Sequence, residues 1–223
     1  MGSCLWWVSP ANAEIGTALS AATDLRFRGY SLSAGRPVGT FDFAYDDPSG
    51  FYASASAIAV AHHGIEPLGV QLSGGYAKRF ESGTTLDLGI VHSNYSHYSS
   101  QGSGNSYTEL YAGIGRKALS ARMSFSPHYF NYRTWTVYGE LDGSVSPARR
   151  LQLDGHVGLL VPVRTTAIAP NQHAEYDWSL GLSRQFGRAS ARAAFSGGGP
   201  GRDFYREYHR RRTALVLSLS YAL

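Results

Sequence analysis

The sequence predicts an all-β fold: a single transmembrane antiparallel β-barrel of about 12 strands, with short periplasmic turns and long external loops. Three observations lead to this prediction. Polar and apolar residues alternate through many segments of about 10 residues, the length that a tilted strand needs to cross a bilayer. No segment keeps a helical period. Long polar connections alternate along the chain with tight ones, as they do in outer-membrane barrels.

The composition agrees with strands rather than with membrane helices. Only 43% of the 223 residues are apolar, and the mean hydropathy is −0.22. No run of about 18 apolar residues occurs that would form a spanning helix. The 26 glycines and the 13% of aromatic residues suit many short strands joined by turns, with aromatic girdles at the two membrane interfaces.

The first residues carry features of an export signal. Ala11-Asn12-Ala13 has the small-residue pattern of a signal-peptidase site, although the apolar segment before it is short. We therefore expect residues 1–13 to be the remnant of a signal peptide and residues 14–223 to form the outer-membrane barrel. Cys4 is the only cysteine, so the chain has no partner for an internal disulfide or for a cysteine zinc site.

The first predicted hairpin begins with a strand over residues 15–31. Alternate residues of a strand face opposite sides, so this strand has a polar face and an apolar face. The polar face comprises Asp24, Arg26 and Arg28. A polar turn at Ser33–Pro37, placed outside the membrane, leads to a second strand over 37–46. Its aromatic face comprises Phe41, Phe43 and Tyr45.

The other ten strands follow the same pattern. They are predicted over 51–61, 68–80, 84–95, 107–116, 119–127, 134–145, 150–163, 174–185, 188–196 and 211–222. Alternation is clearest late in the chain, where one face of the last strand comprises Leu215, Leu217, Leu219 and Tyr221. The connections expected outside include HHGIEP, SHYSSQGSGNS and RTTAIAPNQHA, and those expected in the periplasm include DDPSG, ESG and FGR.

The opening stretch resembles the TorF-type porins, a family of proteobacterial outer-membrane proteins of about this length. The resemblance rests on Thr23–Ser33 (TDLRFRGYSLS), on Pro37, on Phe41–Tyr45 and on Gly50-Phe51-Tyr52. Family members have the pattern S-D-[YL]-x-[FW]-R-G-x-S-x-S. This chain has Thr23 in place of the first Ser, and Leu32 where members have a polar residue. The resemblance implies an outer-membrane barrel that acts as a porin, and it names no solute.

The polar faces of the predicted strands carry eight acidic residues, half of those in the chain, and four arginines. In a barrel these faces would line the lumen and bias which solutes cross. The predicted pore-lining residues are Asp24, Arg26, Arg28, Asp42, Asp87, Glu109, Arg122, Glu140, Asp142, Asp154, Asp177 and Arg192. We therefore expect a passive diffusion channel for small solutes, charged ones among them.

A closed barrel is the alternative to this channel. The same charges would then pair and fill the lumen, and the barrel would have a structural or surface-interaction role. Twelve strands lie between filled eight-stranded barrels and open sixteen-stranded porins, so the strand number leaves both interpretations open.

The last long connection is basic. Its arginines are Arg202, Arg206, Arg210, Arg211 and Arg212. Outside the membrane they would meet the phosphates of lipopolysaccharide, which guanidinium groups bind well. The loop could instead fold inward as a constriction, since Gly197-Gly198-Gly199 gives it conformational freedom, or it could be an ordinary solvated loop.

Other function classes are not expected. The net charge is +4, but the arginines are scattered outside the last loop, so no nucleic-acid partner is expected. An outer-membrane lipid hydrolase would need a His–Ser pair with an acid partner. His92 and Ser93 are adjacent on a strand and therefore face opposite sides, so we expect no enzyme. No cofactor is expected, and no metal site either, because nothing fixes the geometry of His62, His63 and His97.

Overall fold

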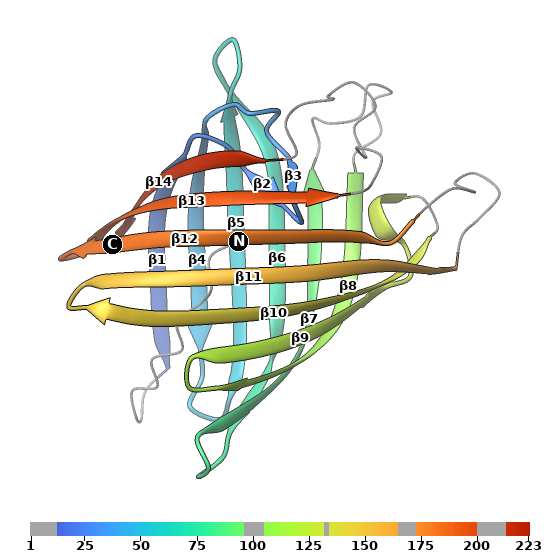
Figure 1. Ribbon diagram of the computed structural model, residues 1–223, viewed down its shortest axis with the longest axis vertical. Helices are drawn as coiled ribbons and strands as arrows, with labels where there is room; N and C mark the ends of the chain where they lie inside the picture. Colours follow the sequence, from blue (N-terminus) through green and yellow to red (C-terminus); the bar gives the residue numbers. More distant parts are fainter. Residues whose placement is uncertain (1–12, 96–104, 132–133, 165–172, 200–212) are drawn as a thin grey trace.

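The computed structural model describes residues 13–95, 105–131, 134–164, 173–199 and 213–223, which form a closed antiparallel barrel (Figure 1). Wall strands pair with their neighbours in chain order, and the first and last strands pair to close the wall. The twelve wall strands are β1 (Glu14–Ala22), β4 (Val38–Asp46), β5 (Phe51–Ala61), β6 (Ile65–Arg79), β7 (Thr84–Tyr95), β8 (Asn105–Arg116), β9 (Leu119–Ser126), β10 (Trp135–Ala148), β11 (Leu151–Arg164), β12 (Glu175–Phe186), β13 (Ala189–Gly199) and β14 (Ala214–Ala222). The predicted fold class is confirmed.

Large apolar side chains point outward all around the wall. Along β7, Leu88 is 61% exposed whereas the adjacent Asp87 is 6% exposed, as the alternation predicts. Other exposed apolar residues are Ile15, Leu19, Phe41, Ile90, Leu110, Met123, Leu141, Val157, Leu180, Leu217 and Leu219. A closed wall leaves no strand edge, so this surface suits hydrocarbon. The closed fold and its apolar outer face place the protein in the outer membrane.

Within the described residues, no helix has the length and apolarity for a membrane crossing.

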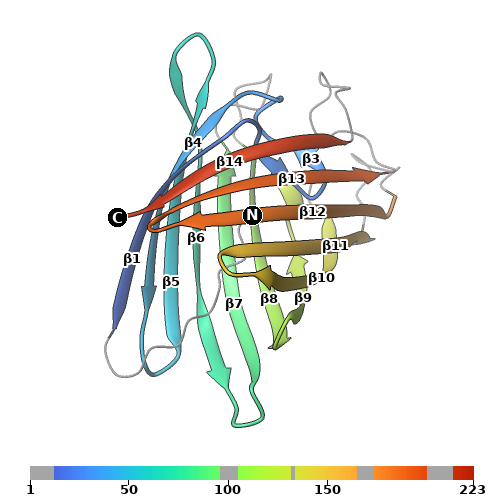
Figure 2. The same cartoon turned by 60° about the vertical axis from the view of Figure 1, so that its left-hand side comes forward.

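The connections keep the predicted alternation of long and short, with one difference. The tight turns are residues 47–50, 80–83, 117–118, 149–150 and 187–188. On the other side, the connection between β5 and β6 is also short, residues 62–64, because β6 begins at Ile65 and not at residue 68. The C-terminus lies beside the tight turns, where the Ala222 amide donates to the Arg188 carbonyl (Figures 1 and 2).

The predicted first strand is wrong beyond Ala22. There the chain leaves the wall, and Arg26–Phe27 (β2) and Tyr30–Ser31 (β3) form a separate two-stranded hairpin. Arg28 and Gly29 between them have positive φ angles of 47° and 81°, the left-handed conformation that both central residues of a type I′ hairpin turn adopt. A period of two is the same in a hairpin as in a wall strand, so the alternation did not distinguish them.

Residues 23–37, named here the inner segment, cross the barrel interior. Gly29 lies against Gly197 and Gly198 of β13, and Arg28 contacts β8 and β10. In the closed strand order, β8 and β10 stand across the barrel from β1 and β4, which flank the segment. In the turn predicted at Ser33–Pro37, Ser33 and Ala34 are buried, whereas Gly35 and Pro37 are exposed.

An apolar core fills the interior around the inner segment. Its members come from the inner segment, from the ends of wall strands near the long connections, and from the short 3₁₀ turn η1 (Tyr129–Asn131). They are Phe27, Leu32, Val38, Ile58, Val60, Leu68, Tyr95, Tyr107, Tyr129, Phe130, Tyr138 and Leu160. This end of the lumen is packed with side chains in the manner of a soluble protein's core.

Candidate functional site

A bidentate ion pair anchors the inner segment to the far wall. The Arg28 guanidinium donates from Nη1 to Glu109 Oε1 at 2.9 Å and from Nη2 to Oε2 at 2.8 Å. The two side chains are 9% and 4% exposed, so the pair is almost removed from water. The fork geometry of Arg matches a carboxylate, which makes this the strongest type of charged hydrogen bond available to the chain.

Aromatic rings enclose the same guanidinium. Its central carbon lies 3.8 Å from the centre of the Tyr138 ring, 4.8 Å from that of Phe27 and 5.3 Å from that of Tyr129. Burial by itself lowers the pKa of Arg28, but Tyr129 and the Glu109 carboxylate outweigh it and raise that pKa well above its ordinary value. Arg28 is therefore a nearly enclosed cation with its charge matched by Glu109.

Hydrogen bonds within the inner segment hold the hairpin in shape. The Asp24 carboxylate accepts from the hydroxyls of Ser31 and Ser33, the latter at 2.8 Å. The Ser33 hydroxyl in turn accepts from the Leu25 amide at 2.9 Å. Arg26 lies 3.6 Å from Asp24 and donates to the Gly29 carbonyl. The three charged residues predicted on the first strand thus lie in the interior, but on the inner segment and not on the wall.

A second polar group lies on β7 to β10. Arg122 Nη2 is 3.4 Å from Asp87 Oδ2, and its Nε is 3.8 Å from Glu140 Oε1, so one guanidinium is shared between two carboxylates. Asp87 also accepts a hydrogen bond from the Tyr52 hydroxyl at 2.5 Å. The Arg122 side chain is 41% exposed, so this pairing is looser and wetter than that of Arg28.

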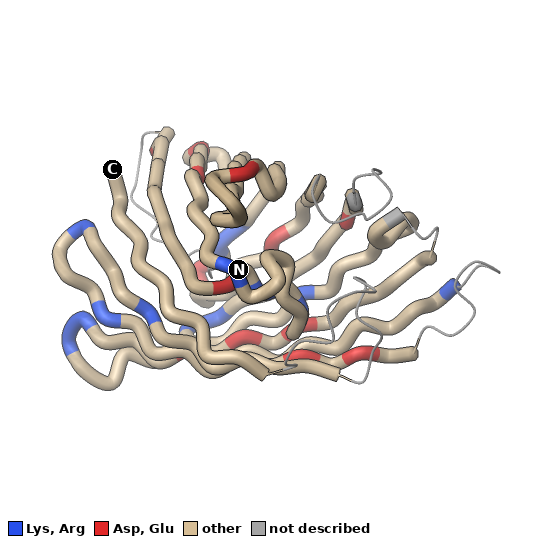
Figure 3. Tube along the Cα trace, turned by 90° about the horizontal axis from the view of Figure 1, so that it is seen from above, with Lys and Arg blue, Asp and Glu red and all other residues tan. Residues whose placement is uncertain are grey.

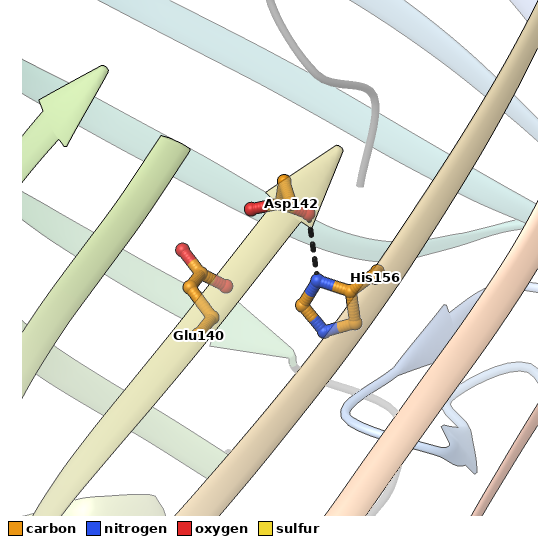
Figure 4. A group of neighbouring side chains, drawn as sticks. All are labelled: Glu140, Asp142 and His156. Atoms are coloured by element: carbon orange, nitrogen blue, oxygen red, sulfur yellow. Dashed lines mark hydrogen bonds and ion pairs between the residues drawn. The ribbon is translucent and has the colours of Figure 1, made fainter. Parts of the chain in front are cut away.

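A third group centres on a histidine between two strands (Figure 4). His156 of β11 stands opposite Asp142 of β10, and its Nδ1 is 2.7 Å from Asp142 Oδ1. On the other side of the ring, Nε2 is 2.9 Å from Asp177 Oδ1 and 3.1 Å from the Tyr138 hydroxyl. The imidazole is therefore held by a carboxylate at each nitrogen.

Glu140 completes this third group. It lies on β10 two residues before Asp142 and thus on the same face of the strand. One carboxylate oxygen of each of the two residues and a ring nitrogen of His156 all lie within 4.8 Å of one another. Gly158 makes room for the arrangement, since a Cβ there would collide with the Tyr138 hydroxyl.

The remaining predicted interior residues form simpler contacts. Arg192 of β13 pairs with Asp154 of β11 and donates to it from Nε at 3.3 Å as well as from Nη2. Asp42 of β4 accepts from the Ser56 hydroxyl at 2.5 Å. Eleven of the twelve predicted pore-lining residues take part in ion pairs. The twelfth, Asp42, has the Ser56 hydroxyl as its partner instead.

The chain has a net positive charge, but its positive residues are not concentrated in the barrel interior. Many cations lie at the tight turns, where Figure 3 shows blue segments gathered at one side of the barrel. They are Lys78, Arg79, Arg116, Lys117, Arg149, Arg150, Arg184 and Arg188, and all are exposed. The predicted basic loop, Arg202 to Arg212, lies outside the described residues. The described interior therefore carries more acids than arginines.

Sequence reasoning missed His156 and Tyr138. The polar alternation of the strand over 150–163 already included His156, and a tight turn at residues 149–150 places it opposite Asp142. That register could have predicted the contact between His156 and Asp142. No sequence pattern could have predicted the role of Tyr138, because it depends on a contact with the inner segment. His92 and Ser93 do face opposite sides, the first exposed and the second buried.

Comparison with protein families gives one match over most of the chain. A model of a family described as bacterial protein of unknown function, Gcw_chp, matches residues 9–211. The chain belongs to the Gcw_chp family. A search of curated proteins gives no match.

Solved structures similar to this Gcw_chp member include two porins and an outer-membrane channel. The NanC porin has a TM-score of 0.62 at 10% identity, covering 93% of this chain and 100% of that one. The KdgM porin has a TM-score of 0.58 at 12% identity, covering 93% and 99%. An outer-membrane channel from Pseudomonas putida F1 has a TM-score of 0.56 at 9% identity, covering 100% and 98%. At these identities the likeness concerns the fold.

Proposed function

We propose that this protein is a porin that lets small solutes diffuse passively across the outer membrane. The observation that carries the proposal is a closed twelve-stranded barrel whose inner face bears charged residues on strands from β4 to β13. The names of similarly folded proteins, porins and a channel, and the resemblance of residues 23–52 to TorF-type porins support it.

The charge of the interior favours cations. The sequence predicts eight acidic residues and four arginines along the pore. The arginines of the inner segment and of β13 are each matched by one acid. The other five acids outnumber the cations beside them, which are Arg122 and His156. These acids are Asp42, Asp87, Glu140, Asp142 and Asp177. A water-filled path along that wall would carry a negative potential, which raises the local concentration of cations.

A closed barrel is the second candidate, and the inner segment is the observation that favours it. This segment and the apolar core around it fill the end of the lumen near the long connections. A solute path past this end needs either a gap beside the segment or its displacement. Under this proposal the barrel would have a structural or surface role.

Single-channel recording in planar bilayers separates the two candidates. The informative variant replaces residues 23–37 by Asn-Gly, because Ala22 and Val38 already pair across the β1–β4 ladder and a two-residue turn can join them. We expect the wild type to conduct with cation preference, and the variant to conduct several-fold more. A silent wild type with a conducting variant would support the closed barrel. Silence in both would contradict the channel.

A further inference from the structure

The geometry points to a binding site for a divalent transition-metal ion, of the Zn²⁺ type, on the inner wall of β10 and β11. Its ligands would be Glu140, Asp142 and His156 Nδ1 (Figure 4). This inference concerns binding and holds whether or not the lumen conducts.

The donor atoms are already gathered. Bonds of about 2.0–2.2 Å from a zinc ion to nitrogen and oxygen place its ligand atoms roughly 3 to 3.5 Å apart. Here the three donor atoms lie within 4.8 Å of one another, and the His156 and Asp142 atoms are 2.7 Å apart. Adjustments of side-chain torsions suffice to surround an ion, since all three residues project from paired strands on the same face.

The far side of the imidazole is held as it is in metal sites. A metal-ligating histidine commonly donates its other ring N–H to a carboxylate, which fixes the tautomer and the orientation of the ring. His156 Nε2 lies 2.9 Å from Asp177 Oδ1, while the Tyr138 hydroxyl also bonds to that carboxylate at 3.1 Å. Nδ1 is thereby directed toward Asp142 and Glu140, where the ion would lie.

The local charge needs a cation. Three carboxylates surround the ring, those of Glu140, Asp142 and Asp177. Among the described residues, the cation paired with these carboxylates besides His156 is Arg122, which lies 3.8 Å from Glu140 and is shared with Asp87. A divalent ion would replace the proton at Nδ1 and neutralise the carboxylates more fully than one guanidinium does.

The donor set selects the class of metal. Two carboxylate oxygens and one imidazole nitrogen suit zinc and its neighbours, whereas magnesium and calcium prefer all-oxygen sites. The three ligand residues are partly exposed, so water can complete the coordination. Such an open site would exchange its ion with the lumen.

Calorimetric titration of the refolded, detergent-solubilised barrel with Zn²⁺ tests the inference. We expect saturable binding of one ion, weaker by at least about tenfold in Glu140→Gln, in Asp142→Asn and in His156→Gln. Asp42→Asn is the matched control, since it removes an equal interior charge on β4, outside the group; its affinity should stay within about twofold. The heat-dependent gel shift of each variant shows whether it has folded.

Mg²⁺ supplies the second comparison. An absence of saturable Zn²⁺ binding would overturn the inference, as would an equal loss of affinity in Asp42→Asn or equal affinity for Mg²⁺, since these describe general attraction to an acidic lumen. Two of the three ligand variants suffice if one fails to fold. The titration needs no open pore, so a silent barrel that binds Zn²⁺ would contradict the proposed channel and leave the metal site standing.

Discussion

The interior holds two charged regions that are built from the same residue types and differ in burial. Around Arg28, one cation meets one carboxylate, both nearly inaccessible, and aromatic rings close the remaining sides. Around His156, three carboxylates share partly exposed cations. In the first region the charges are matched one to one within a packed core. In the second region the carboxylates outnumber the cations, so carboxylate oxygens remain that could bind a metal ion. Accessibility and charge balance, rather than residue type, separate a structural ion pair from a site that can bind.

Tyr138 belongs to both regions. Its ring face lies 3.8 Å from the Arg28 guanidinium, and its hydroxyl contacts His156 and Asp177. Any displacement of the inner segment therefore removes a neighbour from the residue that helps to orient the histidine. The two regions are adjacent parts of one continuous contact network.

The largest effect is expected from breaking the buried pair. Arg28→Ala leaves the Glu109 carboxylate buried without its cation, which should lower the free energy of unfolding by about 3–5 kcal/mol. Urea unfolding followed by tryptophan fluorescence measures it. Combining Arg28→Met with Glu109→Gln removes both charges and should recover most of the loss.

Arg192→Ala is the matched control for that experiment. Its partner is Asp154, and the two side chains are 36% and 15% exposed, so water can replace the lost contact. The expected loss is below about 1 kcal/mol. Equal losses in the two single variants would show that burial does not distinguish the two pairs.

A smaller effect is expected at the tip of the inner hairpin. Gly29 has a φ of +81°, and a Cβ there would lie 2.8 Å from the Gly198 Cα. Gly29→Ala should therefore cost about 2 kcal/mol, from the left-handed backbone and the collision together. Gly35→Ala shares the positive φ but meets nothing within 4 Å, so it should cost only the backbone part. Equal unfolding midpoints for both variants would argue against the contact with β13.

The smallest effect is expected at the tight turns, and Asp47, which is partly exposed, is the example. Hydrogen bonds from the Ser49 side chain and backbone lower the pKa of Asp47 in the turn after β4. The folded state thus favours the ionised form, and this stabilisation is present above the pKa of the unfolded chain and lost as pH falls through the lower folded value. Asp47→Asn should unfold at slightly lower urea than wild type at neutral pH, with the two converging in acid. A difference that grows in acid would contradict this.

The barrel was predictable from sequence because wall strands obey one rule throughout. Where the structure describes the strands predicted over 174–185 and 211–222, their alternation predicted the outward faces correctly, and the tight turns predicted the strand boundaries. The inner segment was not predicted, since its residues alternate just as a wall strand does. One signal was present: a strand over 15–31 is much longer than the 9–11 residues that a crossing needs.

The candidate site was predictable in part. The acids and arginines of the polar faces do lie inside, but their pairing depends on which strands stand opposite, and one sequence does not show that. Arg28 and Glu109 are 81 positions apart and meet only because the inner segment crosses the barrel. Whether these residues line a conducting pore stays a prediction.

Because Ala22 pairs with Val38, the sequence between them can vary without altering the wall of the barrel. β1 and β4 pair directly in the wall, so the wall does not need residues 23–37. These residues are an insertion between two adjacent wall strands. Substitutions, shortening or lengthening there would alter the contents of the lumen while the ladder around it keeps its register. The wall strands that contact the membrane and the segment that fills the lumen are therefore separate parts of the chain.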